Sequence, residues 1–104
     1  MNISTSDISH NQADGGAGHD GGNGFGGGVC VAAAGTVNVS ASDISHNRAD
    51  GGEGDQHGRG RHHGSADGLG VGGGVYNLGT FLADAATVIR HNRAATSNDD
   101  CFGC

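Results

Sequence analysis

One stretch of the chain is repeated almost unchanged 36 residues further on, and this repeat limits the possible folds more than any other feature. Residues 2–16 recur as residues 38–52 with only three substitutions. A weaker third copy, residues 87–94, follows 45 residues after the second. Repetition at this scale predicts a stack of similar units, in which each unit buries its apolar face against its neighbours.

The second copy carries the clearest strand pattern. Residues 35–40 alternate apolar and polar side chains, which predicts a strand with Val37 and Val39 pointing inward. Strict alternation would put Ile44 on the outer face, because it lies seven residues after Val37. We therefore expect a bend after residue 40 and a second short strand at residues 43–45.

Further short strands complete one unit. A turn is expected at His46 and Asn47, with Asn47 in the left-handed conformation that ends such strands. The glycine run and strand of residues 26–31 recur at residues 72–77, and residues 79–82 continue them. Short strands separated by bends, followed by a return to the same pattern, describe one coil of a parallel β-helix.

The residues themselves resemble a known repeat. From residue 72 the chain reads G-G-G-V-Y-N-x-G-T, continued by I-x-x-N-x-A from residue 89. This pattern resembles the right-handed parallel β-helix repeats of large exported bacterial proteins, of the polymorphic outer-membrane, autotransporter-passenger and pectate-lyase-like types. The resemblance covers residues 26–50 and 72–95 well and residues 2–14 in part.

The resemblance implies an all-β fold, a right-handed parallel β-helix of about two to three coils, and an extracellular or cell-surface location. The departures are a long insertion rich in Gly, His, Arg and Asp, and an irregular third copy at residues 83–86. We expect one β-helix unit divided into a partial first coil (1–25), a second coil (26–50), a Gly/His-rich loop (51–71), a third coil (72–97) and a tail (98–104). The predicted core comprises Ile8, Val29, Val31, Val37, Val39, Ile44, Val75, Leu78, Phe81 and Ile89.

The repeat follows Met1 at once, without a signal peptide or a capping element, so we expect a fragment of a longer protein. The net charge is −6 and Lys is absent, which argues against a nucleic-acid partner. The short basic stretch at residues 59–63 is interpreted as a solvated loop. No apolar run approaches the ~20 residues that a membrane-spanning helix needs.

Stacking of the copies would align like side chains in columns. We expect a column of hydrogen-bonded amides, which along such a stack adds to its stability, formed by Asn11, Asn47 and Asn92. Beside it we expect a column of imidazoles formed by His10, His46 and His91. The imidazoles are either exposed turn residues, which we favour, or a metal-binding or pH-sensing stripe.

Two patterns suggest metal binding. Residues 15–20 fit G-G-x-G-x-D, the start of a calcium-binding repeat in which carboxylates and carbonyls supply oxygen ligands. The match stops at Gly22, where a large apolar residue belongs, so a flexible glycine loop is the favoured interpretation and calcium the open alternative. Cys101 and Cys104 form a C-x-x-C pair, half of a zinc site that His62 and His63 could complete, although a local disulfide or free thiols are favoured.

Carboxylates also align, since Asp7 and Asp43 share a position, but the third copy has Val88 or Thr87 there. We therefore expect no catalytic, cofactor-binding or metal site. The expected function is a non-catalytic scaffold that presents loops for adhesion or carbohydrate contact. The alternatives are a fragment of a carbohydrate-active β-helix enzyme and, third, a calcium-binding glycine-rich module. Expected partners are a carbohydrate or cell-surface ligand, together with edge-to-edge self-association.

Overall fold

The computed structural model describes residues 1–54 and 67–104, which form β-strands and contain no helix. The chain passes through a similar series of strands three times. The first pass holds β1 (Asn2–Ser4), β2 (Asp7–Ser9), β3 (Gln12–Asp14), β4 (Gly24–Phe25) and β5 (Val29–Val31). The second holds β6 (Thr36–Ser40), β7 (Asp43–Ser45), β8 (Arg48–Asp50), β9 (Gly70–Val71) and β10 (Val75–Asn77). The third holds β11 (Thr80–Ala83), β12 (Val88–Arg90), β13 (Arg93–Ala94) and β14 (Cys101–Phe102).

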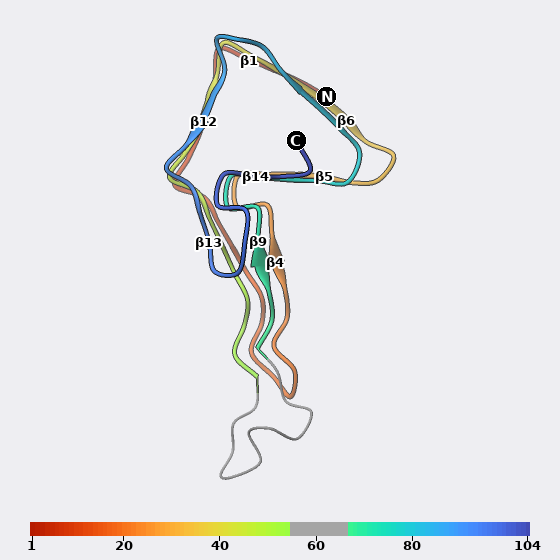
Figure 1. Ribbon diagram of the computed structural model, residues 1–104, viewed down its shortest axis with the longest axis vertical. Helices are drawn as coiled ribbons and strands as arrows, with labels where there is room; N and C mark the ends of the chain where they lie inside the picture. The colour runs from red at the N-terminus through yellow and green to blue at the C-terminus, as the bar shows by residue number, and fades with distance from the viewer. Residues whose placement is uncertain (55–66) are drawn as a thin grey trace.

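Every strand pairs in parallel with its counterpart in the next pass, giving five small sheets: β1-β6-β11, β2-β7-β12, β3-β8-β13, β4-β9 and β5-β10-β14. Seen along the stack, three of these sheets outline a triangular body, and the β3-β8-β13 and β4-β9 sheets form an arm that extends from it (Figure 1). Ile8, Ile44 and Ile89 lie in register on neighbouring strands. The expected all-β fold with parallel strands is therefore confirmed.

The core lies inside the body, where Val29, Val31, Val37, Val39, Ile44 and Val75 form one buried cluster. Ile8, Phe81 and Ile89 are partly buried against it, in agreement with the predicted core. Leu78 was predicted wrongly, because its side chain is 54% exposed. Asn77 takes the inward position instead, and its Oδ1 accepts the amide hydrogen of Gly79 at 3.0 Å. This short polar turn leaves Leu78 pointing outward.

Left-handed residues make the corners of the body. Thr5 and Ala41 have φ values of 46° and 47° between the first and second strands of their passes. At the next corner the left-handed residue is the histidine, with φ of 57° at His46, and not Asn47 as the sequence suggested. The reversal at His46 turns the following side chain inward, so that Asn47 is only 1% exposed.

Glycines bring the backbones of the arm into direct contact. The amide of Gly52 donates to the Gly22 carbonyl oxygen, and the amide of Gly68 donates to the Gly52 carbonyl oxygen, both at 2.8 Å. A Cβ atom on Gly52 would lie 2.2 Å from the carbonyl oxygen of Gly16, which no side chain allows. The stretch at residues 15–20, interpreted as a flexible glycine loop, is tied to the second pass by the amides of Gly15 and Gly18, which donate to the carbonyl oxygens of Asp50 and Glu53. Of the predicted loop at 51–71, residues 55–66 lie outside the described residues.

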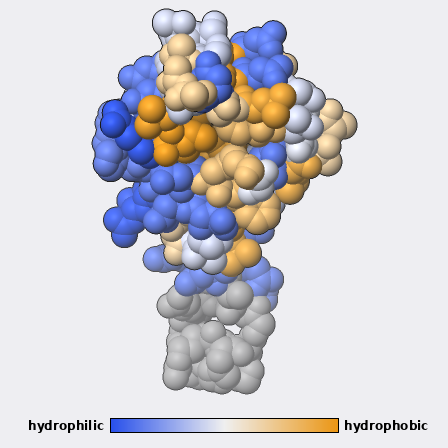
Figure 2. Space-filling view, turned by 45° about the horizontal axis from the view of Figure 1, so that its top comes forward, coloured by the Kyte–Doolittle hydropathy of each residue, from blue (hydrophilic) through white to orange (hydrophobic). Residues whose placement is uncertain are grey.

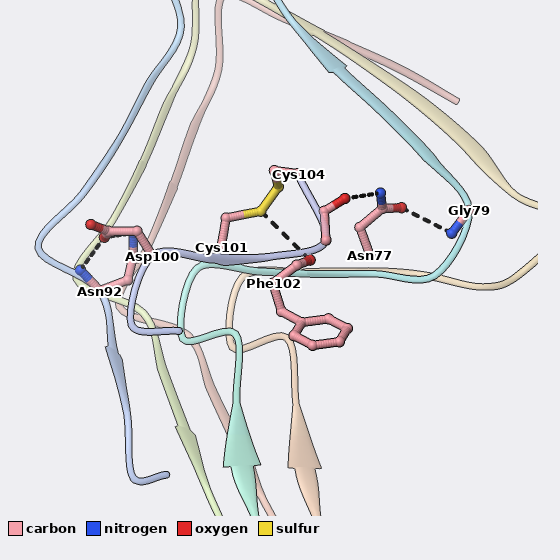
Figure 3. The surroundings of a disulfide bond; sticks show 8 residues. Asn77, Gly79, Asn92, Asp100, Cys101, Phe102 and Cys104 are labelled. Atoms are coloured by element: carbon pink, nitrogen blue, oxygen red, sulfur yellow. Dashed lines mark hydrogen bonds between the residues drawn. A yellow bond between two sulfur atoms is a disulfide. The ribbon is translucent and has the colours of Figure 1, made fainter. Parts of the chain in front are cut away.

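Residues 98–104, expected as a tail, contain β14, which pairs with β10. Cys101 aligns with Val75 and packs against the core. Cys101 and Cys104 form a disulfide, and the chain then turns so that its C terminus lies within the triangular outline (Figures 1 and 3).

Candidate functional site

The predicted amide column is present, and two of its members, Asn47 and Asn92, are buried. The Nδ2 atom of Asn11 donates to Oδ1 of Asn47, and Nδ2 of Asn47 donates to Oδ1 of Asn92, each at 3.0 Å. The same oxygens also accept the backbone amide hydrogens of Asn11 and Asn47, each at 2.9 Å. Each amide thus serves two passes at once, which holds the corner in register. The column ends on Asp100, a residue that sequence reasoning did not identify.

The predicted imidazole column is also present. The ring centroids of His10 and His46 are 5.2 Å apart, and those of His46 and His91 are 5.3 Å apart, with the rings nearly parallel. All three side chains are exposed at the outer corner. Within the described parts of the chain, no three His, Cys, Asp or Glu side chains are grouped so that they could hold a metal ion. The column therefore consists of exposed turn residues without a surrounding ligand set.

One of the two aligned carboxylates is bound by an arginine of the third pass. Asp7 lies in register with Asp43, and Val88 occupies the third position, so the column is interrupted as expected. Oδ2 of Asp43 accepts a hydrogen bond from Nη2 of Arg90 at 3.2 Å, and its Oδ1 is buried without a hydrogen-bond partner. A carboxylate bound to an arginine in this way links the second and third passes.

A carboxyl group with a lowered pKa, that of Asp84, lies at an irregular corner. Hydrogen bonds from the Thr87 hydroxyl, at 2.8 Å, and then from the Ala41 amide, at 3.1 Å, lower the pKa of the exposed Asp84 below its ordinary value. Asp84 lies in the residues 83–86 that break the repeat, where one extra residue lengthens the third pass. Its carboxylate satisfies the amide of the left-handed Ala41, so the group has a structural explanation.

The C-terminal cysteine pair is in one of the two states that the sequence favoured. Cys101 and Cys104 form a local disulfide, which removes both thiolates from metal binding. The other half of the proposed zinc site, His62 and His63, lies outside the described residues, as does the basic stretch at residues 59–63. Cys30 is a free, exposed thiol.

A column of aromatic rings was missed by sequence reasoning. Tyr76 stacks on Phe25 with centroids 4.5 Å apart, and Phe102 stacks on Tyr76 with centroids 4.9 Å apart. Phe102 points to the opposite side of β14 from the disulfide, outside the triangular body (Figure 3). Alignment of residues 26–31 with 72–77 places Tyr76 opposite Cys30 and not on Phe25, and β14 has no copy in the repeat, so the repeat gave no signal for this column.

On the face drawn in Figure 2, hydrophobic residues gather over the triangular body and hydrophilic residues surround them. Large apolar side chains that remain exposed include Leu78, Leu82 and Val88, the last two on the third pass. The surface thus offers apolar and aromatic contact area. Among those residues, no helix has the length and apolar character required to cross a membrane.

Comparison with known proteins adds no identification. The chain matches no protein-family model, no curated protein and no solved structure.

Proposed function

We propose that the protein is part of a right-handed parallel β-helix and acts as a non-catalytic scaffold of an exported or cell-surface protein. The observation that supports this most is the interior amide column of Asn11, Asn47 and Asn92, which links three parallel passes in register. A scaffold of this kind keeps its shape through stacking of like residues. Its outer side chains and the connections between strands are then available for contact with adhesion partners or carbohydrates.

Location outside the cell is supported by the Cys101–Cys104 disulfide. Disulfides form and persist in oxidising compartments, whereas the cytosol of most cells keeps such pairs reduced. The repeat pattern of exported bacterial β-helix proteins points in the same direction. The free thiol of Cys30 is compatible with this location. Its counterpart on the neighbouring strand is Tyr76, so no cysteine is aligned with Cys30 there to form a disulfide.

The proposed contact surface includes the aromatic column, because its last ring, Phe102, follows Tyr76 at the end of the stack. Aromatic rings and apolar side chains supply contact area that orders few side-chain torsions. Neither alternative function is favoured by an observation. The enzyme reading lacks a continuous carboxylate column, since Val88 interrupts it. The calcium reading has no cluster of acidic side chains in the described residues.

A panel of immobilised glycans and intact cells, probed with the labelled protein, tests the scaffold proposal. We expect binding that is lost in Phe102→Ala and retained in Leu82→Ala, a control that removes an exposed apolar side chain from a different sheet. Circular dichroism verifies that both variants are folded. Cleavage of pectin-like polymers by the purified chain would contradict the non-catalytic role, and a gain of β signal on adding Ca²⁺ would favour the calcium module. Absence of binding to every glycan and cell type by the folded protein would contradict the contact role.

A further inference from the structure

The chain contains two copies of the acceptor sequence for N-linked sugars, which is Asn-x-Ser or Asn-x-Thr with any residue but proline in the middle. The copies are residues 2–4 and residues 38–40. They lie in register on β1 and β6, so that each asparagine and each serine stands beside its counterpart. A sequence this short also arises by chance, so its surroundings in the fold decide whether a sugar fits on it.

The alternation of β6 turns both reactive side chains of its acceptor sequence away from the core. Val39 points inward and is 2% exposed, whereas Asn38 is exposed. Side chains two residues apart lie on the same face of a strand, so Ser40 shares the outer face with Asn38. The amide nitrogen that would carry the sugar and the hydroxyl that the acceptor sequence requires therefore face the same way.

The sheet that holds this sequence, β1-β6-β11, forms one side of the triangular body (Figure 1). Its three described strands carry no charged side chain. The outward positions hold amides, hydroxyls and one leucine: Asn2, Ser4, Thr36, Asn38, Ser40, Thr80 and Leu82. Covering a charged side chain would cost free energy, and a sugar laid on these strands covers none.

The leucine of this face lies next to the acceptor asparagine. Leu82 on β11 is in register with Asn38 on β6, and its side chain is 57% exposed. Neighbouring strands are about 4.8 Å apart, so the first sugar on Asn38 would lie beside Leu82. The C–H groups of a sugar ring that cover this side chain remove apolar surface from water. Asn2 lies one strand further away, so a sugar attached there would leave Leu82 uncovered.

The hydrogen bond of Asn38 is compatible with a sugar. Its Nδ2 atom donates to Oδ1 of Asn2 at 3.1 Å. An amide nitrogen carries two hydrogens, and this bond uses one of them. Replacement of the other hydrogen by a sugar therefore keeps the link between the first and second passes.

We propose that Asn38 is an N-glycosylation site and that its first sugar covers Leu82. This rests on the proposed location outside the cell, where proteins with such sequences carry sugars. The co-reactant is a sugar whose anomeric carbon is linked to a pyrophosphate. Nδ2 forms a bond to that carbon, the carbon–oxygen bond breaks, the pyrophosphate leaves with the electron pair, and one Nδ2 hydrogen is lost as a proton.

The test secretes the whole chain from cultured animal cells behind a cleavable leader. N-glycosidase digestion in heavy-oxygen water, followed by mass spectrometry of peptides, locates the sugar, because the enzyme converts the modified asparagine to a labelled aspartate. We expect most secreted chains to carry a sugar at Asn38. Nuclear Overhauser effects from the ring protons of the first sugar to the methyl groups of Leu82 should also be present.

Three matched variants show which acceptor sequence is used. Ser40→Ala removes the required hydroxyl and leaves Asn38 and its bond to Asn2 in place, so the sugar at Asn38 should be lost. Ser40→Thr keeps a hydroxyl and should keep the sugar. Ser4→Ala removes only the acceptor sequence of the first pass and should leave Asn38 modified.

Unmodified Asn38 in a folded, secreted chain would overturn the proposal, as would modification of Asn2 alone or equal modification of Ser40→Ala. A sugar on Asn38 without contacts to Leu82 would contradict the second part of the proposal. If the chain stays inside the cell, the same digestion is carried out on the retained protein, and unmodified Asn38 there has the same meaning. The glycan and cell panel, probed with Ser40→Ala, tests the scaffold role on a chain without this sugar, so the two failures remain distinguishable.

Discussion

The side chain of Asn47 donates to Oδ1 of Asn92 at 3.0 Å in the interior of the stack, although 45 residues separate them in the sequence. Asn47 is 1% exposed, and its Nδ2 also donates to the carbonyl oxygen of Ile8 at 2.8 Å. One side chain therefore ties together all three passes.

Replacing this amide should be costly. In Asn47→Ala the backbone amide of Asn11 loses its partner inside the protein, and Oδ1 of Asn92 keeps only the backbone amide of residue 47. An unsatisfied buried group costs about 1–3 kcal/mol. We expect the free energy of unfolding, measured by urea denaturation, to fall by roughly 2–4 kcal/mol.

The matched control is Asn38→Ala, since Nδ2 of Asn38 donates to Oδ1 of Asn2 at 3.1 Å between the first and second passes but at the surface. Water replaces that bond, so the loss should stay within about 0.5 kcal/mol. Equal losses in the two variants would show that the buried amide column contributes no more to the free energy of unfolding than a surface hydrogen bond does.

The glycine packing of the arm predicts different results at two equivalent positions of the repeat, Gly16 and Gly52. A Cβ atom on Gly52 would lie 2.2 Å from the Gly16 carbonyl oxygen, whereas one on Gly16 would meet nothing within 4 Å. Gly52→Ala should therefore lower the free energy of unfolding by about 3 kcal/mol or more, because the backbones at residues 16 and 52 must move apart. Gly16→Ala should change it by less than about 1 kcal/mol. Similar small effects at both sites would mean that the arm is loosely packed.

The left-handed corner at Ala41 offers a stabilising change. Its φ of 47° places Cβ close to the following carbonyl oxygen, which costs roughly 1–2 kcal/mol and which glycine avoids. Ala41→Gly should raise the free energy of unfolding by about 0.5–1 kcal/mol after the entropy of the unfolded glycine is deducted. Ala85→Gly, at an exposed position without a positive φ, should lower it. A loss of stability in Ala41→Gly would contradict the corner geometry.

Asp84 predicts an acid-dependent contribution. Its pKa is lowered from the ordinary value of 3.8, first by the Thr87 hydroxyl and then by the Ala41 amide, so the folded state binds the proton more weakly than the unfolded state. The contribution of Asp84 to stability is therefore complete above pH 3.8 and is lost as the pH falls through the lower, folded-state pKa.

The measurement compares the free energy of unfolding of the parent and of Asp84→Asn across this range, since Asn keeps an oxygen acceptor and cannot ionise. The parent should be the more stable of the two at neutral pH, and the difference should shrink below pH 3.8. A difference that stays constant through the acid range would show that the charge of Asp84 is irrelevant.

Much of the stack could be predicted because aligning the copies of the repeat also gives the register of their strands. Once residues 2–16 are placed above residues 38–52, the columns of Asn, His and Ile follow, and the inward Val37 and Val39 follow from alternation. The repeat does not show which residue of the corner has the positive φ, because His and Asn both tolerate it. Only the inward direction of the Asn47 side chain assigns the positive φ to His46.

The remaining features depend on contacts between residues that neither composition nor the repeat reveals. A glycine run is equally compatible with a mobile loop and with backbones packed at Gly52, and only the neighbouring backbone decides between them. Leu78 was placed in the core for its apolarity, but the turn at Asn77 and Gly79 directs it outward. Asp100 and Phe102 have no counterpart in the repeat, so no alignment could bring them to the ends of their columns.

The alignment of the three Ile-x-His-Asn stretches is tested most directly by the isoleucine methyl groups. The chain has only four isoleucines, Ile3, Ile8, Ile44 and Ile89, so selective methyl labelling gives a spectrum that can be fully assigned. Parallel strands about 4.8 Å apart should give nuclear Overhauser effects from Ile44 to both Ile8 and Ile89. Methyl groups of Ile8, Ile44 and Ile89 that show no such contacts in the folded protein would contradict the stacked register.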